Sequence, residues 1–446
     1  MLVNFMIKIK KRVIWFLIIL ISIPTLAFCQ DDLQEKTKSL EDSIRLMLYK
    51  ERPYFEVVNY GANRIQMKDS TSLDYFFEAL YKLQTQKKGG KGEKAQVKVL
   101  HMGDSHIQAD FFTGKVRNLF QEDKRFGNAG RGFIFPYSAA KTNNPFDYKT
   151  RYTGIWTSQK MVSSKDESQW GISGINVETT NPKSTITIEP VAYNERTPTK
   201  IEKVRIYYPI LNEELFEAVI IAPTNEIKSQ QMHPDGYLEV IFSVPQTSIS
   251  IGLDKTDDIQ THFILQGISL ETNDKGILYH AVGINGAETR HYLRCEDFET
   301  QLRSIQPDLV VISLGTNDAY PVKFDDVAFK GNLSKIIAQI RNINPNTSIL
   351  LTSPNDTYRY KKYANYNTQK AEERLQELVR EKDVALWNFY QIMGGFKSIA
   401  DWQKAGLGQY DRIHLSQTGY NLQGELFYEA INEQYKKWIE KNRPKL

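Results

Sequence analysis

The sequence contains little cysteine. Only Cys29 and Cys295 occur among its 446 residues, and no Cys-x-x-Cys pair of the kind that binds metals or exchanges disulfides is present. Cys29 closes an apolar leading segment that we expect to be removed, which leaves Cys295 without a partner in the same chain. An intrachain disulfide is therefore excluded for the mature chain.

The chain also lacks an excess of charge once the leading segment is set aside. Residues 1–29 carry four of the 57 Lys and Arg residues and none of the 53 Asp and Glu residues, so the remainder holds 53 of each. The formal net charge then falls from +4 to zero. The apparent basicity belongs to the leading segment, and we expect no nucleic-acid partner.

The leading segment has the organisation of a secretory signal. Four basic residues within positions 8–12 precede an almost wholly apolar run over residues 13–28, and polar residues follow. We predict a signal peptide over residues 1–29 and export to the periplasm or cell envelope. One alternative is an uncleaved membrane anchor. A second is lipidation of Cys29, although Phe28 is bulky where a bacterial lipobox has a small residue.

The length of the chain favours two or three units. We predict an N-terminal helical arm over residues 31–94, since apolar residues recur at spacings of three and four within it. Apolar strand candidates alternate with helix candidates over residues 95–147 and again over 274–446. This alternation predicts an α/β core with a parallel sheet covered on both faces.

The two parts of this core are separated by residues 148–273. Short runs rich in Val, Ile, Tyr, Phe and Thr are punctuated there by Asn, Asp, Gly and Pro, without helices between them. The pattern predicts an inserted β-sandwich. Ahead of it, the glycine-rich segment 127–133 lacks the Gly-Lys-Ser/Thr ending of a phosphate-binding loop. We interpret that segment as a loop near the rim of an active site.

A serine follows the first strand candidate of the core directly. The apolar run over residues 97–102 ends at the turn formers Gly103 and Asp104, Ser105 comes next, and a helix is predicted over 109–120. Open α/β sheets bind their ligands at the carboxyl ends of strands. Ser105 is therefore a candidate nucleophile, provided that the chain supplies a base, an orienting acid and oxyanion donors.

The candidate base is His414, one of seven histidines. Asp411 stands three residues before it, so in a helical or turn backbone the two share a face. The carboxylate can then accept a hydrogen bond from one imidazole nitrogen and leave the other for Ser105. Taken alone, such a short pattern more often marks a capping aspartate beside a packed histidine.

The candidate oxyanion donors follow two other strand candidates. Asn317 comes after the apolar run 307–314 and carries a side-chain amide, and Gly286 follows the run 277–283 with an N–H that no side chain shields. The N–H of Ser105 is a third candidate donor. The ordinary alternative is that Asn317 and Gly286 merely form turns.

Together these residues resemble the SGNH (GDSL-like) hydrolase superfamily. Its four blocks correspond, in the family's order, to Gly103-Asp104-Ser105, Gly286, Gly315-x-Asn317-Asp318 and Asp411-x-x-His414. The resemblance covers about residues 95–130 and 276–440. The glycine block is the loosest, and Gly283 could take the place of Gly286.

This resemblance implies a three-layer α/β/α flavodoxin-like core and ester hydrolysis. Ser105 would be the nucleophile, His414 the base and Asp411 its orienting acid, while Ser105, Gly286 and Asn317 would form the oxyanion hole. The sequence Gly-Asp-Ser-His and the position of the β insert are similar to bacterial peptidoglycan O-acetylesterases. Those proteins carry a carbohydrate-binding-like domain at the same place.

We therefore expect an exported serine esterase that removes O-acyl groups, foremost O-acetyl groups, from a glycan such as peptidoglycan or another polysaccharide. The alternatives are a glycan O-acetyltransferase that uses the same triad and a non-catalytic glycan-binding envelope protein. The expected partner is the acylated glycan. A membrane is a partner only if Cys29 is lipidated or the leading segment is retained.

Two pairs of residues could either bind a ligand or serve only the packing of the fold. His280 and His291 flank the glycine block, but no His-Glu-x-x-His motif or Cys/His cluster accompanies them, so we expect neither a metal nor a cofactor. Trp156 and Trp170 stand near the start of the insert and could stack on sugars. Such residues more often anchor the packing of a domain.

Overall fold

The computed structural model describes residues 47–443 except 48, 86–95, 165–168, 193–199 and 223. The predicted signal peptide and Cys29 lie outside the described residues. The chain divides into two units, one ending at Glu56 and one beginning at Val57. The described residues of the first unit, 47–56, form the end of a helix and a series of turns. Among the described helices, none has the length and apolarity needed to cross a membrane.

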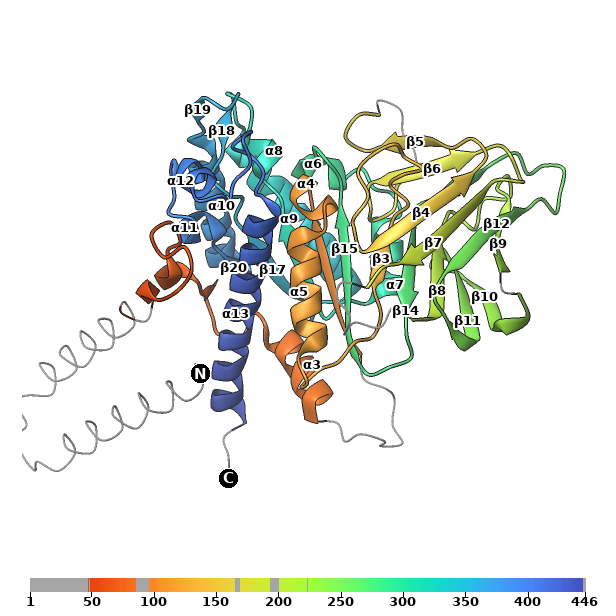
Figure 1. Ribbon diagram of the computed structural model, residues 1–446, viewed down its shortest axis with the longest axis horizontal. Coiled ribbons are helices and arrows are strands. Elements are labelled where there is room, and N and C mark those ends of the chain that lie inside the picture. Colours follow the sequence, from red (N-terminus) through yellow and green to blue (C-terminus); the bar gives the residue numbers. More distant parts are fainter. Residues whose placement is uncertain are drawn as a thin grey trace, which may run out of the picture. The chain divides into compact units, whose positions relative to one another are not determined.

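The second unit is built on a six-stranded sheet (Figure 1). Its strands, in sheet order, are β1 (Ile65–Met67), β20 (Ala385–Trp387), β17 (Ser348–Thr352), β16 (Leu309–Ser313), β2 (Gln96–Gly103) and β15 (Gly276–Gly283). All neighbouring pairs are parallel except β1 with β20. The strands β16 and β17 are buried almost throughout, which explains their continuous apolar sequences.

Helices cover both faces of this sheet. In Figure 1, α5 and α13 lie in front of the sheet, and α9 lies behind it. The helices of at least seven residues are α3 (Asp74–Thr85), α5 (Phe111–Glu122), α7 (Phe298–Ile305), α9 (Asp326–Ile343), α10 (Asn367–Glu381), α12 (Ser398–Lys404) and α13 (Gln417–Asn442). The shorter ones are η1 (Tyr60–Ala62), α4 (Ser105–Gln108), α6 (Thr289–Tyr292), α8 (Thr316–Ala319), α11 (Phe389–Ile392) and η2 (Thr224–Glu226). The arrangement confirms the predicted α/β fold.

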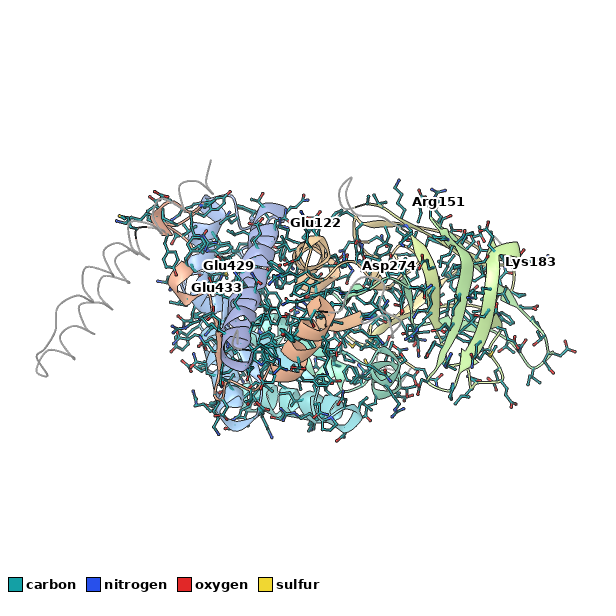
Figure 2. All side chains as sticks on the ribbon, turned by 90° about the horizontal axis from the view of Figure 1, so that it is seen from below. Glu122, Arg151, Lys183, Asp274, Glu429 and Glu433 are labelled. Atoms are coloured by element: carbon teal, nitrogen blue, oxygen red, sulfur yellow. The ribbon has the colours of Figure 1, made fainter. Side chains whose placement is uncertain are left out.

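Antiparallel sheets separate the two halves of the α/β part. The largest contains β10 (Ile227–His233), β11 (Tyr237–Gln246), β8 (Ile201–Tyr207), β14 (Gly267–Glu271) and β3 (Gly132–Ile134). A second contains β4 (Tyr148–Thr153), β7 (Thr185–Pro190), β12 (Ile249–Asp254) and β9 (Glu217–Ala222), and a third β13 (Phe263–Leu265), β6 (Ile175–Thr179) and β5 (Thr157–Lys160). Figure 2 shows Arg151 and Lys183 on this β part, and Glu429 and Glu433 on α13.

The structure differs from the sequence-based expectation at both ends of the first half. Residues 57–85 are not a separate arm, because β1 extends the sheet beside β20 and α3 packs against the core. The glycine-rich segment is not at the active-site rim, because Gly132 begins β3, which pairs with β14 of the insert. A side chain at Gly132 would meet the Tyr279 carbonyl oxygen at 2.6 Å, which explains the glycine there.

The helix predicted over 109–120 is interrupted near its start. It begins at Phe111, because Asp110 adopts a left-handed backbone conformation with φ of 56°. The buried Asp110 carboxylate pairs with Arg117 at 2.6 Å and with Arg131 at 2.7 Å, and both arginines also pair with Asp147. This buried cluster joins α5 to the two segments that lead into the insert.

Candidate active site

Ser105 lies just beyond the carboxyl end of strand β2, which ends at Gly103. It opens the single-turn helix α4, and Asp104 accepts a hydrogen bond from the His106 N–H at 3.0 Å. A side chain at Gly103 would lie 2.4 Å from Ile107 and 2.6 Å from the Ser313 carbonyl oxygen. The turn therefore requires glycine there, and Figure 1 shows α4, α6 and α8 at the same end of the sheet.

The predicted serine, histidine and aspartate form one continuous hydrogen-bonded chain. The Ser105 Oγ lies 2.9 Å from His414 Nε2, and His414 Nδ1 lies 2.7 Å from Asp411 Oδ2. The other oxygen of Asp411 accepts hydrogen bonds from the N–H groups of Ile413 and His414. Asp411 thus caps its own turn and orients the imidazole at the same time, so both interpretations of the Asp-x-x-His pattern apply.

The charges and hydrogen bonds around His414 make its imidazole more basic. Burial alone would lower the pKa of His414, but the hydrogen bond and the charge of Asp411 outweigh it and raise that pKa above its usual value. Burial likewise raises the pKa of Asp411, but hydrogen bonds from His414 and from backbone N–H groups lower it to about 2. Asp411 is therefore ionised, and His414 is poised to accept a proton from Ser105.

Two of the three predicted oxyanion donors have free N–H groups. Among the described residues, none accepts a hydrogen bond from the backbone N–H of Ser105 or of Gly286. Gly286 has a φ of 81° and lines the pocket in front of Ser105. The alternative Gly283 does not line it, and a side chain at Gly283 would meet the Gln108 N at 2.5 Å.

The third donor, Asn317, also faces this pocket but already has acceptors. Its Nδ2 donates to the Ala287 carbonyl oxygen at 3.0 Å and to Asp104 Oδ2 at 3.3 Å. An amide nitrogen has two hydrogens, so Asn317 must exchange one of these bonds to reach a substrate oxyanion. The longer bond to Asp104 is the one that an oxyanion would replace at the lower cost.

Asp104 has a role beyond the turn that the sequence indicates. It is buried, and burial raises its pKa to about 7 despite the hydrogen bond from the His106 N–H. It holds both the start of α4 and the amide of Asn317. Its adjacency to Ser105 marks it in the sequence, but the contact with Asn317 spans 213 positions and leaves no local signal.

His106 is a second contributor that the sequence analysis did not identify. Its ring centroid lies 5.0 Å from that of His414, and the Tyr420 hydroxyl lies 2.7 Å from His106 Nδ1. Burial lowers the pKa of His106 to about 3, so the ring stays neutral. It packs beside the His414 imidazole without adding a competing charge.

Gln108 is a third. It is buried, and its Oε1 accepts a hydrogen bond from the Asn285 N–H at 2.8 Å, directly before Gly286. Its Nε2 donates to the Asn143 side chain at 3.0 Å, and the Asn285 amide donates to the same Asn143 oxygen at 2.8 Å. Gln108 thus ties the Gly286 turn both to α4 and to the segment that leads into the insert.

The pocket in front of Ser105 is open, with a volume of about 510 Å³. Aromatic and aliphatic side chains form part of its wall, and amides form much of the rest. It is lined by Ser105, Ala109, Phe111, Asn143, Asn285, Gly286, Thr316, Asn317, Tyr320, Gln409, Ile413, His414 and Tyr420. Asn143 comes from the segment that leads into the insert, so that segment contributes directly to the site.

The remaining candidates are buried. His280 and His291 are 1% and 4% exposed, and their Nδ1 atoms accept hydrogen bonds from the N–H groups of Phe133 and Glu288. Trp156 and Trp170 are 5% and 1% exposed. Their burial favours the packing interpretation of these tryptophans over sugar contact.

Comparison with known proteins agrees with this geometry. The GDSL-like Lipase/Acylhydrolase family matches residues 248–422, a range that includes Gly286, Asn317, Asp411 and His414. A search of the curated proteins finds no match. Among solved structures, one titled "Peptidoglycan O-acetylesterase in action, 5 min" is 20% identical with a TM-score of 0.68, over 84% of this chain and 99% of its own.

Two smaller structures also match. A lipase/acylhydrolase from Enterococcus faecalis is 21% identical with a TM-score of 0.29, over 36% of this chain and 78% of its own. An acetyl xylan esterase is 19% identical with a TM-score of 0.29, over 35% of this chain and 81% of its own.

Residues 248–422 therefore match the SGNH (GDSL-like) hydrolase type, as the motifs predict. Ser105 lies outside the matched range, because the insert separates it from the other blocks in the sequence. In the folded chain Ser105 lies next to His414. Within that class the chain is a carboxylic ester hydrolase, with a layout similar to the peptidoglycan O-acetylesterase structure.

Proposed function

We propose that this chain is an exported serine esterase that removes O-acyl groups, foremost O-acetyl groups, from a glycan such as peptidoglycan or another polysaccharide. The observation that carries the proposal is the hydrogen-bonded chain from Ser105 through His414 to Asp411 at the wall of an open pocket. The free N–H groups of Ser105 and Gly286 support it, because both residues line this pocket and can donate to an oxyanion there.

The mechanism follows from these positions. Ser105 Oγ attacks the ester carbonyl while His414 Nε2 takes its proton, and Asp411 stabilises the resulting imidazolium. The oxyanion is held by the N–H groups of Ser105 and Gly286 and by Asn317. The intermediate collapses as His414 returns the proton to the departing sugar hydroxyl, which leaves an acyl ester on Ser105. Water then attacks this ester with His414 as the base and releases the acid.

The choice of a glycan rests on the surroundings of the triad. A pocket of about 510 Å³ is far larger than an acetyl group requires, and its open mouth admits a polymer. The segment leading into the insert places Asn143 in the pocket wall. The similar structure titled as a peptidoglycan O-acetylesterase, and the predicted export signal, agree with a cell-envelope glycan.

The test compares the wild type with Ser105→Ala on 4-nitrophenyl acetate and on O-acetylated peptidoglycan or xylan. We expect the wild type to release acetate from a glycan and Ser105→Ala to lose this activity while it unfolds at the same temperature. Undiminished turnover by Ser105→Ala would contradict the proposal. Acetyl groups that appear on a second sugar, detected by mass spectrometry, would instead indicate the O-acetyltransferase.

A further inference from the structure

A small hairpin beside the catalytic pocket presents exposed aromatic rings. It is formed by β18 (Tyr358–Arg359) and β19 (Tyr363–Ala364). Tyr360 at its tip is 73% exposed, and Tyr410, on the segment before Asp411, is 74% exposed. Burial within the chain does not explain rings left so open to solvent.

This hairpin is fastened to the catalytic segment. The Tyr358 N–H donates to the Arg412 carbonyl oxygen at 2.9 Å, and the Arg412 guanidinium donates to the Lys361 carbonyl oxygen at 3.2 Å. The Tyr360 N–H donates at 3.2 Å to the hydroxyl of Tyr320, which lines the catalytic pocket. The surface formed by Tyr320, Tyr360 and Tyr410 is therefore continuous with the pocket wall.

The hairpin also carries unpaired positive charge. Lys361 Nζ lies 4.6 Å from the centre of the Tyr410 ring, and in the part of the chain that the structure describes no acidic residue pairs with Lys361 or Lys362. The Nη1 atom of Arg359 is shielded from solvent without a hydrogen-bond acceptor. Both oxygens of Asp411 already accept hydrogen bonds from its own turn and His414 rather than from these lysines.

The backbone at the tip is unusual as well. Tyr360 and Lys361 both lie in the left-handed region, with φ of 52° and 62°, where hairpin turns ordinarily place Asn or Gly. A tyrosine and a lysine in such positions cost stability without any compensating buried contact of their side chains. This observation agrees with a role for the two side chains outside the folding of the chain.

We propose that Tyr360, Tyr410 and Lys361 form a subsite for a carboxylate-bearing sugar of the glycan whose neighbouring unit presents its ester to Ser105. Tyrosine rings offer flat apolar faces with a polar edge, which suits a sugar ring. The ammonium group of Lys361 supplies the charge-assisted hydrogen bond to the carboxylate. The assignment of this surface to the substrate rests on the proposed function, and it restricts the substrate to anionic glycans.

The test measures binding without turnover, in the Ser105→Ala protein, by calorimetric titration of tetragalacturonate at low salt. We expect Lys361→Glu to weaken binding about tenfold, the equivalent of one charge-assisted hydrogen bond, and Tyr410→Ala to weaken it about tenfold through loss of the ring face. The matched control is Lys437→Glu, an exposed lysine of α13. It lies 20 residues from the start of that helix, or about 30 Å along its axis, so we expect no change.

Three results would overturn the subsite. The first is no binding of tetragalacturonate, or equal binding by Lys361→Glu and Lys437→Glu. The second is equally tight binding of a neutral galactose tetrasaccharide, which would show that the surface does not recognise the carboxylate. The third is equally tight binding of tetraglutamate, which would indicate a surface for acidic peptides. A wild type that binds as expected but releases no acetate from any glycan would contradict the proposed function instead.

Discussion

Ser105 Oγ and His414 Nε2 lie 2.9 Å apart although 309 positions separate the two residues in the chain. Ser105 is fixed by the end of β2, and the histidine is fixed by its own short loop. The Gln409 N–H donates to the His414 carbonyl oxygen at 2.8 Å, and the Asn355 amide donates to the Ile413 carbonyl oxygen at 2.7 Å. These hydrogen bonds hold Ser105 and His414 in contact before substrate binds, as acyl transfer requires.

Replacing Asn317 tests the oxyanion site. Asn317→Ala should lower kcat about 10²- to 10³-fold with little change in KM, since the amide acts on the developing charge rather than on the bound ester. Steady-state kinetics with 4-nitrophenyl acetate measure kcat and KM separately. A higher KM with unchanged kcat would mean that Asn317 binds the ester in the ground state instead.

The pH dependence of kcat/KM tests the partnership of Asp411 and His414. His414 must be neutral to take the serine proton, and its pKa lies above the usual 6.5, so activity should rise with pH through an apparent pKa above 6.5. Asp411→Asn removes the charge that raises this pKa. The acid limb should then move to lower pH, with kcat reduced on the order of 10⁴-fold. An unmoved limb would mean that another group titrates.

Gln108 is expected to act as a positioning residue for the Gly286 turn. Gln108→Ala removes the acceptor for the Asn285 N–H and should lower kcat about tenfold, the worth of roughly one hydrogen bond. Gln108→Glu keeps that acceptor and should restore part of kcat. If both variants change only the unfolding temperature and leave kcat intact, Gln108 is structural.

The buried charge cluster is expected to stabilise the chain rather than to catalyse. Arg117→Ala would leave Asp110 and Asp147 partly unpaired and should lower the free energy of unfolding by about 3–5 kcal/mol. Urea unfolding measures this. The control is Arg151→Ala, which breaks the exposed pair with Glu189 and should cost about 1 kcal/mol or less. Equal losses in the two variants would contradict the burial argument.

The α/β core and the hydrogen-bonded chain of Ser105, His414 and Asp411 could be predicted because their signals are local. The strands β16 and β17 contain continuous apolar runs, and a chemically distinctive residue follows β2, β15 and β16. The edge strand β1 was not predicted, because three residues carry no periodicity and its partner β20 lies over 300 positions away. The break before α5 was missed for a similar reason, since the arginines that hold Asp110 come from other segments.

The residues that hold the site in place through hydrogen bonds could not be predicted from the sequence. Asp104, His106 and Gln108 stand beside the nucleophile, but their partners Asn317, Tyr420 and Asn285 lie more than 170 positions away. A strand-end position indicates that a side chain can reach a pocket. It does not indicate which hydrogen bonds the folded chain offers once it is there.

The central claim is that Ser105 carries the acyl group during turnover. The most direct measurement mixes the wild type with an O-acetylated glycan, quenches the reaction within its first turnovers and maps the protein by peptide mass spectrometry. The account predicts one acetyl group on the peptide that contains Ser105, and none in Ser105→Ala. Release of acetate without any acetylation of that peptide, and with Ser105→Ala fully active, would contradict it.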